Sequence, residues 1–303
     1  MRYSEAKPFI KWAGGKRQLI PTLEKSLPYK FSEIEDLTYI EPFVGGGAML
    51  FFLLRKFSNI KRAIINDLNS NLIIAYNTVR DNPEGLVYEL SKVQEEYFNI
   101  SDEKQRKDFY LSMRNRFNAG NLSKVENTAL LIFLNRTCFN GLYRVNANGE
   151  FNVPFGKYKN PKICDAETIY ADSELLQMVE ILNGDFEQTE PYLTENTFVY
   201  LDPPYRPLDA TSSFNAYAKE PFNDLEQVRL KKYVDRLSFK RCFLMLSNSD
   251  CKGRNPEDSF FDDLYKDYII ERVYASRYIN ANPQKRGRLT ELLIRNYVDT
   301  QLL

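Results

Sequence analysis

Short apolar runs and helical segments alternate along the first part of the chain. The pattern predicts a buried strand at 38–40, a triple-glycine turn at 45–47, an apolar helix at 48–57 and a second strand at 62–66. A strand, glycine turn, helix and strand in this order form a βαβ unit, which implies a parallel sheet. Ligands of such sheets bind at the carboxyl ends of the strands.

After residue 82 the pattern changes to charged helical segments. Three helices are predicted at 84–98, 102–117 and 123–136, and the last opens with Ser123 and Glu126 in capping-box spacing. A polar, aromatic and glycine-containing loop region follows, through residue 161.

Strand signals then resume. They lie at 180–184, 197–201, 242–246, 268–273 and 290–297, with a helical segment at 224–237. The chain therefore divides into a first catalytic part at 1–80, a helical insertion at 81–164 and a second catalytic part at 165–303.

Composition narrows the class of protein. A chain of 303 residues can bury a large core, and no apolar run approaches the ~18 residues of a membrane span. The four cysteines have no CxxC spacing, which is typical of reduced thiols, so we expect a soluble, cytoplasmic protein. Histidine is absent, which excludes histidine acid–base catalysis and argues against a zinc or other metal centre.

The overall charge is balanced, with 41 basic and 41 acidic residues, so it does not by itself indicate a nucleic-acid partner. Two stretches are locally basic, at 136–162, where Glu150 is the only acid, and at 285–288. Such stretches contact phosphate in some proteins and are ordinary solvated loops in others, and charge alone leaves both readings open.

The apolar run at 197–201 ends in Asp202-Pro203-Pro204-Tyr205. The prolines stiffen the turn, so that the Asp202 carboxylate and the Pro203 carbonyl can both face outward as acceptors. Two acceptors suit an exocyclic amine of a base, whose conjugated lone pair makes it a poor nucleophile until it is drawn toward tetrahedral geometry. Tyr205 offers a flat face for the ring. The alternative is a plain tight turn after a core strand.

The glycine turn has features of a nucleoside site. Its backbone can approach a ligand closely, and Asp67 ends the next strand roughly twenty residues later, where an acid typically binds ribose hydroxyls. A tight βα connection is the alternative. Gly184-Asp185-Phe186 closes another strand and could supply an acid and an aromatic ring to a purine. The cluster at 11–16 is not a phosphate loop, because Arg17 stands where Ser or Thr is required.

Several of these motifs occur together in one order. The segments 8–16, 41–48 and 202–205, supported by 140–144, 150–158 and 246–248, closely resemble the alpha group of the Dam family of DNA adenine-N6 methyltransferases. The resemblance implies an S-adenosylmethionine-dependent α/β fold, Rossmann-like, with a mixed seven-stranded sheet whose seventh strand is antiparallel. The helical insertion would be the target-recognition domain.

The resemblance also assigns roles. Asp202, Pro203, Pro204 and Tyr205 would clamp the target base, with in-line transfer to a flipped adenine. Phe43 and the Gly45 turn would hold the methionine moiety, Asp67 the ribose, and Asp185 with Phe186 the adenine. The full set of implied cofactor contacts is Trp12, Ala13, Gly14, Lys16, Pro42, Phe43, Gly45, Asp67, Asp185, Phe186 and Asp202.

The stretch 139–144, followed by Pro154, resembles the recognition hairpin of members that methylate GATC. Arg144 would read guanine through a bidentate contact, and Phe139 with Asn140 would fill the gap left by the flipped base. Thr137-Cys138-Phe139 departs from the more tyrosine-rich segment of the housekeeping enzyme. The implied DNA contacts are Arg136, Phe139, Asn140, Tyr143, Arg144, Pro154, Lys157 and Tyr158.

The sequence thus predicts a site-specific methyltransferase that modifies adenine in duplex GATC with S-adenosylmethionine, functionally paired with a restriction endonuclease. Around Tyr143 and Val145 the sequence is especially similar to GATC-modifying enzymes that are paired with restriction endonucleases. Two alternatives remain: a DNA-binding protein with an inactive catalytic site, and a methyltransferase acting on RNA or on a protein amide nitrogen.

Overall fold

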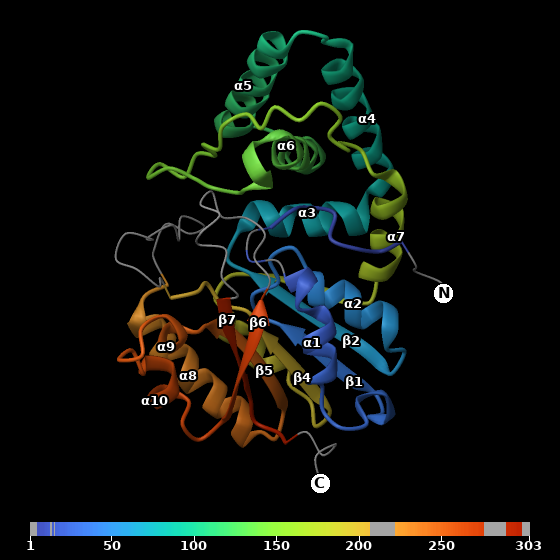
Figure 1. Cartoon of the computed structure of the whole chain (residues 1–303). Helices are drawn as coiled ribbons and strands as arrows, with labels where there is room; N and C mark the ends of the chain where they lie inside the picture. The colour runs from blue at the N-terminus through green and yellow to red at the C-terminus, as the bar shows by residue number, and fades with distance from the viewer. Residues whose placement is uncertain (1–4, 13, 15, 207–221, 276–288, 299–303) are drawn as a thin grey trace.

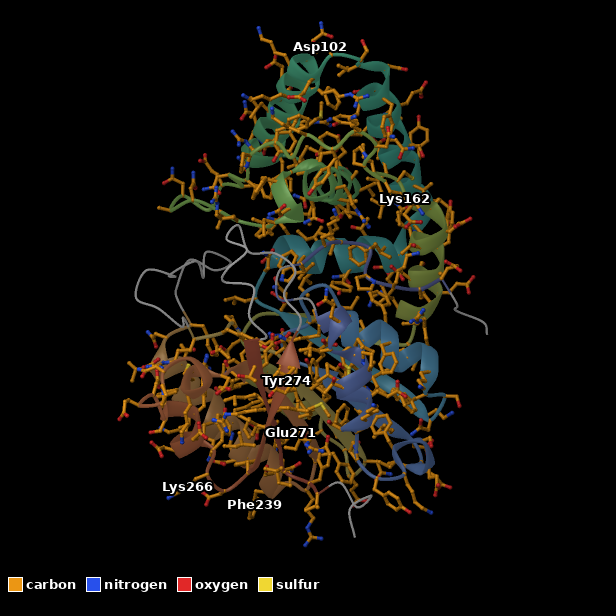
Figure 2. All side chains as sticks on the ribbon, viewed as in Figure 1. Asp102, Lys162, Phe239, Lys266, Glu271 and Tyr274 are labelled. Atoms are coloured by element: carbon orange, nitrogen blue, oxygen red, sulfur yellow. The ribbon has the colours of Figure 1, made fainter. Side chains whose placement is uncertain are left out.

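A single seven-stranded sheet and a helical lobe form the molecule, and helix α3 (Ser70–Asp81) lies between them (Figure 1). The computed structural model describes residues 5–12, 14, 16–206, 222–275 and 289–298, so Ala13 and the basic stretch 285–288 lie outside the described residues. Asp102, at the far end of the lobe, and Phe239, at the opposite end of the molecule, mark its long dimension in Figure 2. In the described part of the chain, no helix has both the length and the hydrophobicity needed to cross a bilayer.

The sheet has the mixed topology that the sequence predicts. Its strand order is β3-β2-β1-β4-β5-β7-β6, and all neighbours are parallel except β7, which runs antiparallel to β5 and β6. Every predicted strand is present, with its ends shifted by a few residues at most. The strands are β1 (Leu37–Glu41), β2 (Ile60–Asp67), β3 (Val179–Asn183), β4 (Thr197–Leu201), β5 (Phe243–Ser249), β6 (Ile269–Ala275) and β7 (Leu289–Arg295).

Helices bury both faces of the sheet, because successive strand residues point to opposite sides. Tyr39 and Phe198 join one hydrophobic cluster, whereas their neighbours Ile40 and Val199 join another. The first cluster includes residues of α1 (Ile20–Lys25), α2 (Ala48–Lys56), α3 (Ser70–Asp81) and α7 (Ala166–Leu176). The second includes residues of α8 (Asp224–Phe239), α9 (Cys251–Arg254) and α10 (Phe260–Leu264).

Three helices form the lobe, as predicted: α4 (Pro83–Asn99), α5 (Glu103–Ala119) and α6 (Lys124–Thr137). Helix α6 is almost entirely buried and packs on α3, which lies between the lobe and the sheet (Figure 1). Helices α3 and α7 were not predicted from the sequence. The chain enters the lobe between α3 and α4 and returns to the sheet domain through α7, so the boundaries 81 and 164 fall beside these two helices.

The capping box of α6 is confirmed. The Ser123 hydroxyl accepts a hydrogen bond from the Glu126 N–H at 3.2 Å, and the Glu126 carboxylate accepts one from the Ser123 N–H at 3.1 Å. We expect Ser123→Ala to lower the free energy of unfolding by about 1 kcal/mol, because the Glu126 N–H loses the hydroxyl that accepts its hydrogen bond. Urea denaturation measures the change. Ser91→Ala, on the exposed face of α4, is the control and should be neutral or slightly stabilising; equal effects of the two substitutions would contradict the capping role.

Candidate active site

The loops that follow the parallel strands are tied to one another by a buried amide. Asn66, at the end of β2, donates from its Nδ2 to the carbonyls of Pro42 and Gly184, both at 3.0 Å. Its Oδ1 accepts a hydrogen bond from Gln188 at 2.9 Å. Asn66 therefore fixes the ends of β1 and β3 relative to β2, and the sequence motifs did not single it out.

The glycine turn after β1 packs tightly against neighbouring side chains. Gly45 has φ of 49°, and a Cβ atom there would lie 2.8 Å from Cδ1 of Trp12. The Gly45 N–H donates to one oxygen of Asp67 at 3.0 Å, and the other oxygen accepts from the N–H of Asn69 at 2.9 Å. Burial raises the pKa of Asp67, and these N–H donors oppose the shift. The turn, Trp12 and the predicted ribose-binding carboxylate thus form one unit.

Phe43 and Phe186 also come together, with ring centroids 5.3 Å apart. Beside them, Asp185 accepts two hydrogen bonds from Arg229, at 2.7 and 3.0 Å, which lowers the pKa of this carboxyl. The Arg229 guanidinium lies over the Phe186 ring, 4.2 Å from its centroid. The predicted purine-binding acid and ring are therefore adjacent, and Arg229, which the sequence did not indicate, contacts both.

Asp202 lies in a buried cluster of charged groups. Its carboxylate is 3.2 Å from the ammonium of Lys16, a side chain that is only 5% exposed. The same ammonium donates to Glu291 at 3.1 Å and also contacts the Tyr205 hydroxyl, which donates to Glu291 at 2.8 Å. Lys16, predicted to contact the cofactor, thus also contacts Asp202, which is predicted to clamp the target base. Glu291, on β7, was not predicted.

The environment of Asp202 opposes its ionisation. Burial raises its pKa to about 6; the Lys16 ammonium acts against this shift and the Glu291 carboxylate adds to it. Burial also raises the pKa of Tyr205 well above its usual value, so the phenol stays protonated. The site therefore places a carboxylate that ionises near neutral pH beside an aromatic ring.

Buried amides support the Asp-Pro-Pro-Tyr turn from behind. The Pro204 carbonyl accepts a hydrogen bond from Gln227 at 3.1 Å, and Gln227 in turn accepts one from Asn248 at 3.1 Å. Both amide side chains are fully buried. The stiffness expected from the prolines is thus reinforced by α8 and β5. Asn248 belongs to a motif quoted for the resemblance, whereas Gln227 carried no sequence signal.

The predicted recognition hairpin extends from the end of α6. Phe139 is 51% exposed, and Asn140 beside it has φ of 55° and is also exposed. Tyr143, in contrast, is buried and stacks on Trp12, with centroids 5.1 Å apart and planes at 24°. The Arg144 guanidinium is held across the hairpin by Asn152, at 2.7 Å from Nε to Oδ1.

The other residues predicted to contact DNA differ in their placement. The half-buried Arg136 donates to the carbonyl of Phe9 at 2.8 Å, and burial lowers its pKa. The ammonium of Lys157 is 2.8 Å from Glu103, and both side chains are exposed. The Pro154 carbonyl accepts the N–H of Phe139 at 2.8 Å. Lys11 lies over the ring of Tyr158, at 5.1 Å from its centroid. Arg136 and Tyr143 thus pack inward, whereas Lys157 remains accessible.

A model of the family described as D12 class N6 adenine-specific DNA methyltransferase matches residues 12–279. The chain belongs to this family. The match spans the glycine turn, the recognition hairpin and the Asp-Pro-Pro-Tyr turn. It identifies the protein as a D12-class enzyme that methylates adenine in DNA, and it does not support the alternative of an RNA or protein-amide methyltransferase.

Relatives of the D12-class enzyme match over nearly its whole length. Type II methyltransferase M.MjaIII of Methanocaldococcus jannaschii is 47% identical over 97% of this chain and 100% of its own. Type II methyltransferase M1.LlaDCHI of Lactococcus lactis is 40% identical over 96% of this chain and 95% of its own. DNA adenine methylase of Haemophilus influenzae is 33% identical over 95% of this chain and 92% of its own.

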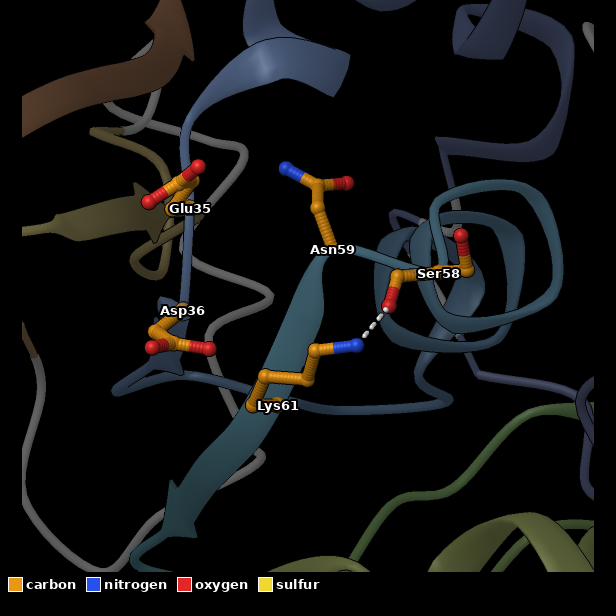
Figure 3. Close-up of a pocket in the computed structure, with 5 residues that line it drawn as sticks. All are labelled: Glu35, Asp36, Ser58, Asn59 and Lys61. Carbon is orange, nitrogen blue, oxygen red and sulfur yellow. Dashed lines mark hydrogen bonds between the residues drawn. The ribbon is translucent and has the colours of Figure 1, made fainter.

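A surface hollow lies at the opposite ends of the strands from Asp67 and Asp202, and it lacks the aromatic rings found near those residues (Figure 3). It is lined by Glu35, Asp36, Ser58, Asn59 and Lys61, near the amino ends of β1 and β2. Lys61 donates to the Ser58 carbonyl at 2.8 Å. Its lining combines charged and polar side chains with no aromatic face, which does not fit a nucleoside. Among the described residues, no cluster of three potential metal ligands is present.

The contact between Gly45 and Trp12 can be tested optically, because Trp12 is the single tryptophan of the chain. Gly45→Ala should displace the indole, change its fluorescence emission and slow methyl transfer, since the new Cβ would lie 2.8 Å from the ring. Gly120→Ala is the matched control: its φ is 68° and the space around it is open. That variant should lose about 1–3 kcal/mol from backbone strain but keep the emission unchanged. An unaltered spectrum for Gly45→Ala would refute the close packing.

Proposed function

We propose that the enzyme transfers a methyl group from S-adenosylmethionine to N6 of an adenine flipped out of duplex GATC. The main support is that Asp67 ends β2 and that Asp202 and Tyr205 follow β4, on either side of β1, so that all three lie at the carboxyl ends of parallel strands, where a base and a nucleoside cofactor can meet. Relatives named Type II methyltransferase support a functional pairing with a restriction endonuclease.

The residues at the strand ends fit the proposed cofactor. Asp67 has a carboxylate at the position for ribose hydroxyls, and Phe43 with Phe186 offers aromatic surface for a purine. Glycine at position 45 lets the turn pack against Trp12, since a side chain there would collide with the indole. The same lack of a side chain lets the backbone of the turn approach a ligand. When bound, S-adenosylmethionine supplies an electrophilic methyl group on a sulfonium.

Asp202 and the turn that follows it prepare the nucleophile. The Asp202 carboxylate and the Pro203 carbonyl each accept a hydrogen bond from one N–H group of the adenine amine. These two hydrogen bonds draw the lone pair of the amine nitrogen out of conjugation with the ring. Tyr205 packs against the base. As the nitrogen gains the methyl group it becomes positively charged, and the nearby carboxylate stabilises that charge until a proton leaves. Positioning supplies the remainder of the rate enhancement.

The hairpin provides the DNA-facing elements. Phe139 is a large exposed aromatic side chain next to Asn140, as expected of residues that replace a flipped base. Arg144 is held by Asn152, which limits the directions its guanidinium can take and favours a defined contact with one guanine. The exposed Lys157 and Lys159 suit phosphate.

Transfer of labelled methyl groups tests the activity as a whole. Duplexes containing GATC, and duplexes with each base pair of the site substituted in turn, are compared as substrates. Methylation confined to adenine of GATC supports the proposal; equal methylation of every duplex would overturn the assigned target sequence, and no methylation of any duplex would overturn the catalytic assignment.

Asp202 should make the reaction dependent on pH. Because the ionised form is the better acceptor and its pKa is raised to about 6, the single-turnover rate should fall as pH decreases through that value. Above that pH, Asp202→Ala should slow transfer by on the order of 100-fold, as expected for loss of one contact to a developing charge, with DNA binding retained. The difference from the wild type should narrow at lower pH, because wild-type Asp202 is then protonated. Asp108→Ala, an exposed acid of α5, is the control. A pH-independent rate between pH 5 and about 8 would contradict this role.

Arg144 should determine preference at one base pair. Arg144→Ala is expected to weaken binding to the cognate site by about 1–3 kcal/mol and to relax discrimination at a single guanine. Binding to the substituted duplexes at two salt concentrations provides the measurement.

Lys157→Ala is the matched comparison for Arg144→Ala. It should weaken cognate and non-cognate binding alike and reduce the salt dependence. If Arg144→Ala behaved in the same way, Arg144 would be a phosphate contact only.

A further inference from the structure

Glu291 reaches the methyl-transfer site because its strand runs against the others. The parallel strands β1, β2, β3 and β4 have their carboxyl ends at the site. Strand β7 is antiparallel, so its amino end lies there. Glu291 lies near that beginning, paired in register with Ser249 of β5 and Val273 of β6. Its side chain is almost fully buried. The pairing of β7 with β5 on one side and with β6 on the other thus holds the Glu291 carboxylate in the interior, beside Lys16.

The single positive charge of Lys16 is shared between two carboxylates, those of Asp202 and Glu291. Its ammonium is 3.2 Å from Asp202 and 3.1 Å from Glu291, so neither acid has the cation to itself. A buried ammonium facing a single carboxylate would form a close pair, and that pair would occupy the oxygen that accepts the adenine amine. The second carboxylate therefore reduces the hold of Lys16 on Asp202.

Glu291 also fixes the ring that faces the base. The Tyr205 hydroxyl donates to the same Glu291 oxygen that accepts from Lys16, at 2.8 Å. The Lys16 ammonium lies 4.2 Å from the centroid of the Tyr205 ring. Glu291 thus contacts the two side chains that flank Asp202 and lies behind them.

We propose that Glu291 is a positioning residue for methyl transfer, which divides the Lys16 charge between two acids and orients Tyr205, so that Asp202 remains a free acceptor. This inference rests on the function proposed above, in which Asp202 accepts the adenine amine. It assigns no contact between Glu291 and either the base or the cofactor.

The charged and titratable groups around Asp202 define the expected pH effect. They are Lys16, Glu291 and Tyr205, together with Tyr200 of its own strand and Glu41 of β1. Burial raises the pKa of Glu41 well above its usual value and so opposes its ionisation. Glu291 raises the pKa of Asp202, so removal of its charge should lower that pKa.

Glu291→Gln is therefore expected to have two effects on the single-turnover rate. The plateau above neutral pH should fall at least tenfold, because Lys16 then pairs closely with Asp202. The acidic limb should move to lower pH, because Asp202 ionises more readily. A loss of packing alone would lower the plateau without moving the limb, so the pH profile separates positioning from a structural role. Dissociation constants for cofactor and for GATC duplex should change less than threefold.

Two further variants complete the test. Glu180→Gln makes the same change on β3 in an exposed ion pair with Arg62, and it should match the wild type. Glu291→Asp keeps the charge but shortens the side chain by roughly 1.5 Å. It should keep the acidic limb in place while lowering the plateau, which ties the moved limb of Glu291→Gln to the lost charge. If Glu291→Gln does not fold, unchanged dissociation constants of Glu291→Asp for cofactor and GATC duplex separate its lowered plateau from a general loss of packing.

Different results overturn different claims. A Glu291→Gln plateau within twofold of wild type, or a lowered plateau with an unmoved limb, refutes the positioning role. If only Glu291→Asp folds, a plateau within twofold of wild type refutes it, and so does a lowered plateau accompanied by dissociation constants raised more than threefold. Absence of adenine methylation by the wild-type enzyme would instead overturn the proposed function itself.

Discussion

The packing of the Lys11–Trp12 segment between the sheet and the lobe is the contact on which the arrangement of the site depends. The Trp12 indole covers Gly45 on the sheet side and stacks on Tyr143 of the hairpin on the other side. Asn135 of α6 bonds both the N–H and the carbonyl of Lys11, each at 2.8 Å. A segment near the start of the chain thus links the predicted recognition hairpin to the glycine turn at the carboxyl end of β1.

The sequence singles out candidate site residues that follow parallel strands. Asp67, Asp185 and Asp202 were predicted because acids at the carboxyl ends of such strands converge. Glu291 could not be found by the same rule, since it lies at the beginning of an antiparallel strand. Arg229 was missed for another reason: its local spacing to Glu226 gives an ordinary helical pair, and its contact with Asp185 exists only after folding.

The fold was predictable to a similar extent. Short apolar runs bounded by turns located all seven strands, and the capping box located α6 to within a residue. Helix α3 is absent from the predicted elements although its sequence carries a helical signal: an Asn69 cap followed by buried residues at 72, 75, 76 and 79. The inward placement of Arg136 and Tyr143 could not be predicted, because basic and aromatic residues in a loop carry the same pattern whether they face DNA or the protein.

One hydrophobic cluster runs from the first face of the sheet through α3 into α6 and the rest of the lobe. The helical lobe is therefore not a separable module, and loss of its packing would extend into the sheet domain. A lobe taken from a relative would have to preserve its fit to α3 in order to fold on this sheet. The hairpin tip, residues 146–150, carries no such constraint, since its bonds are mostly internal and its side chains are largely exposed. Divergence in target sequence within the family is thus expected to proceed by substitution in the hairpin and not by exchange of whole lobes.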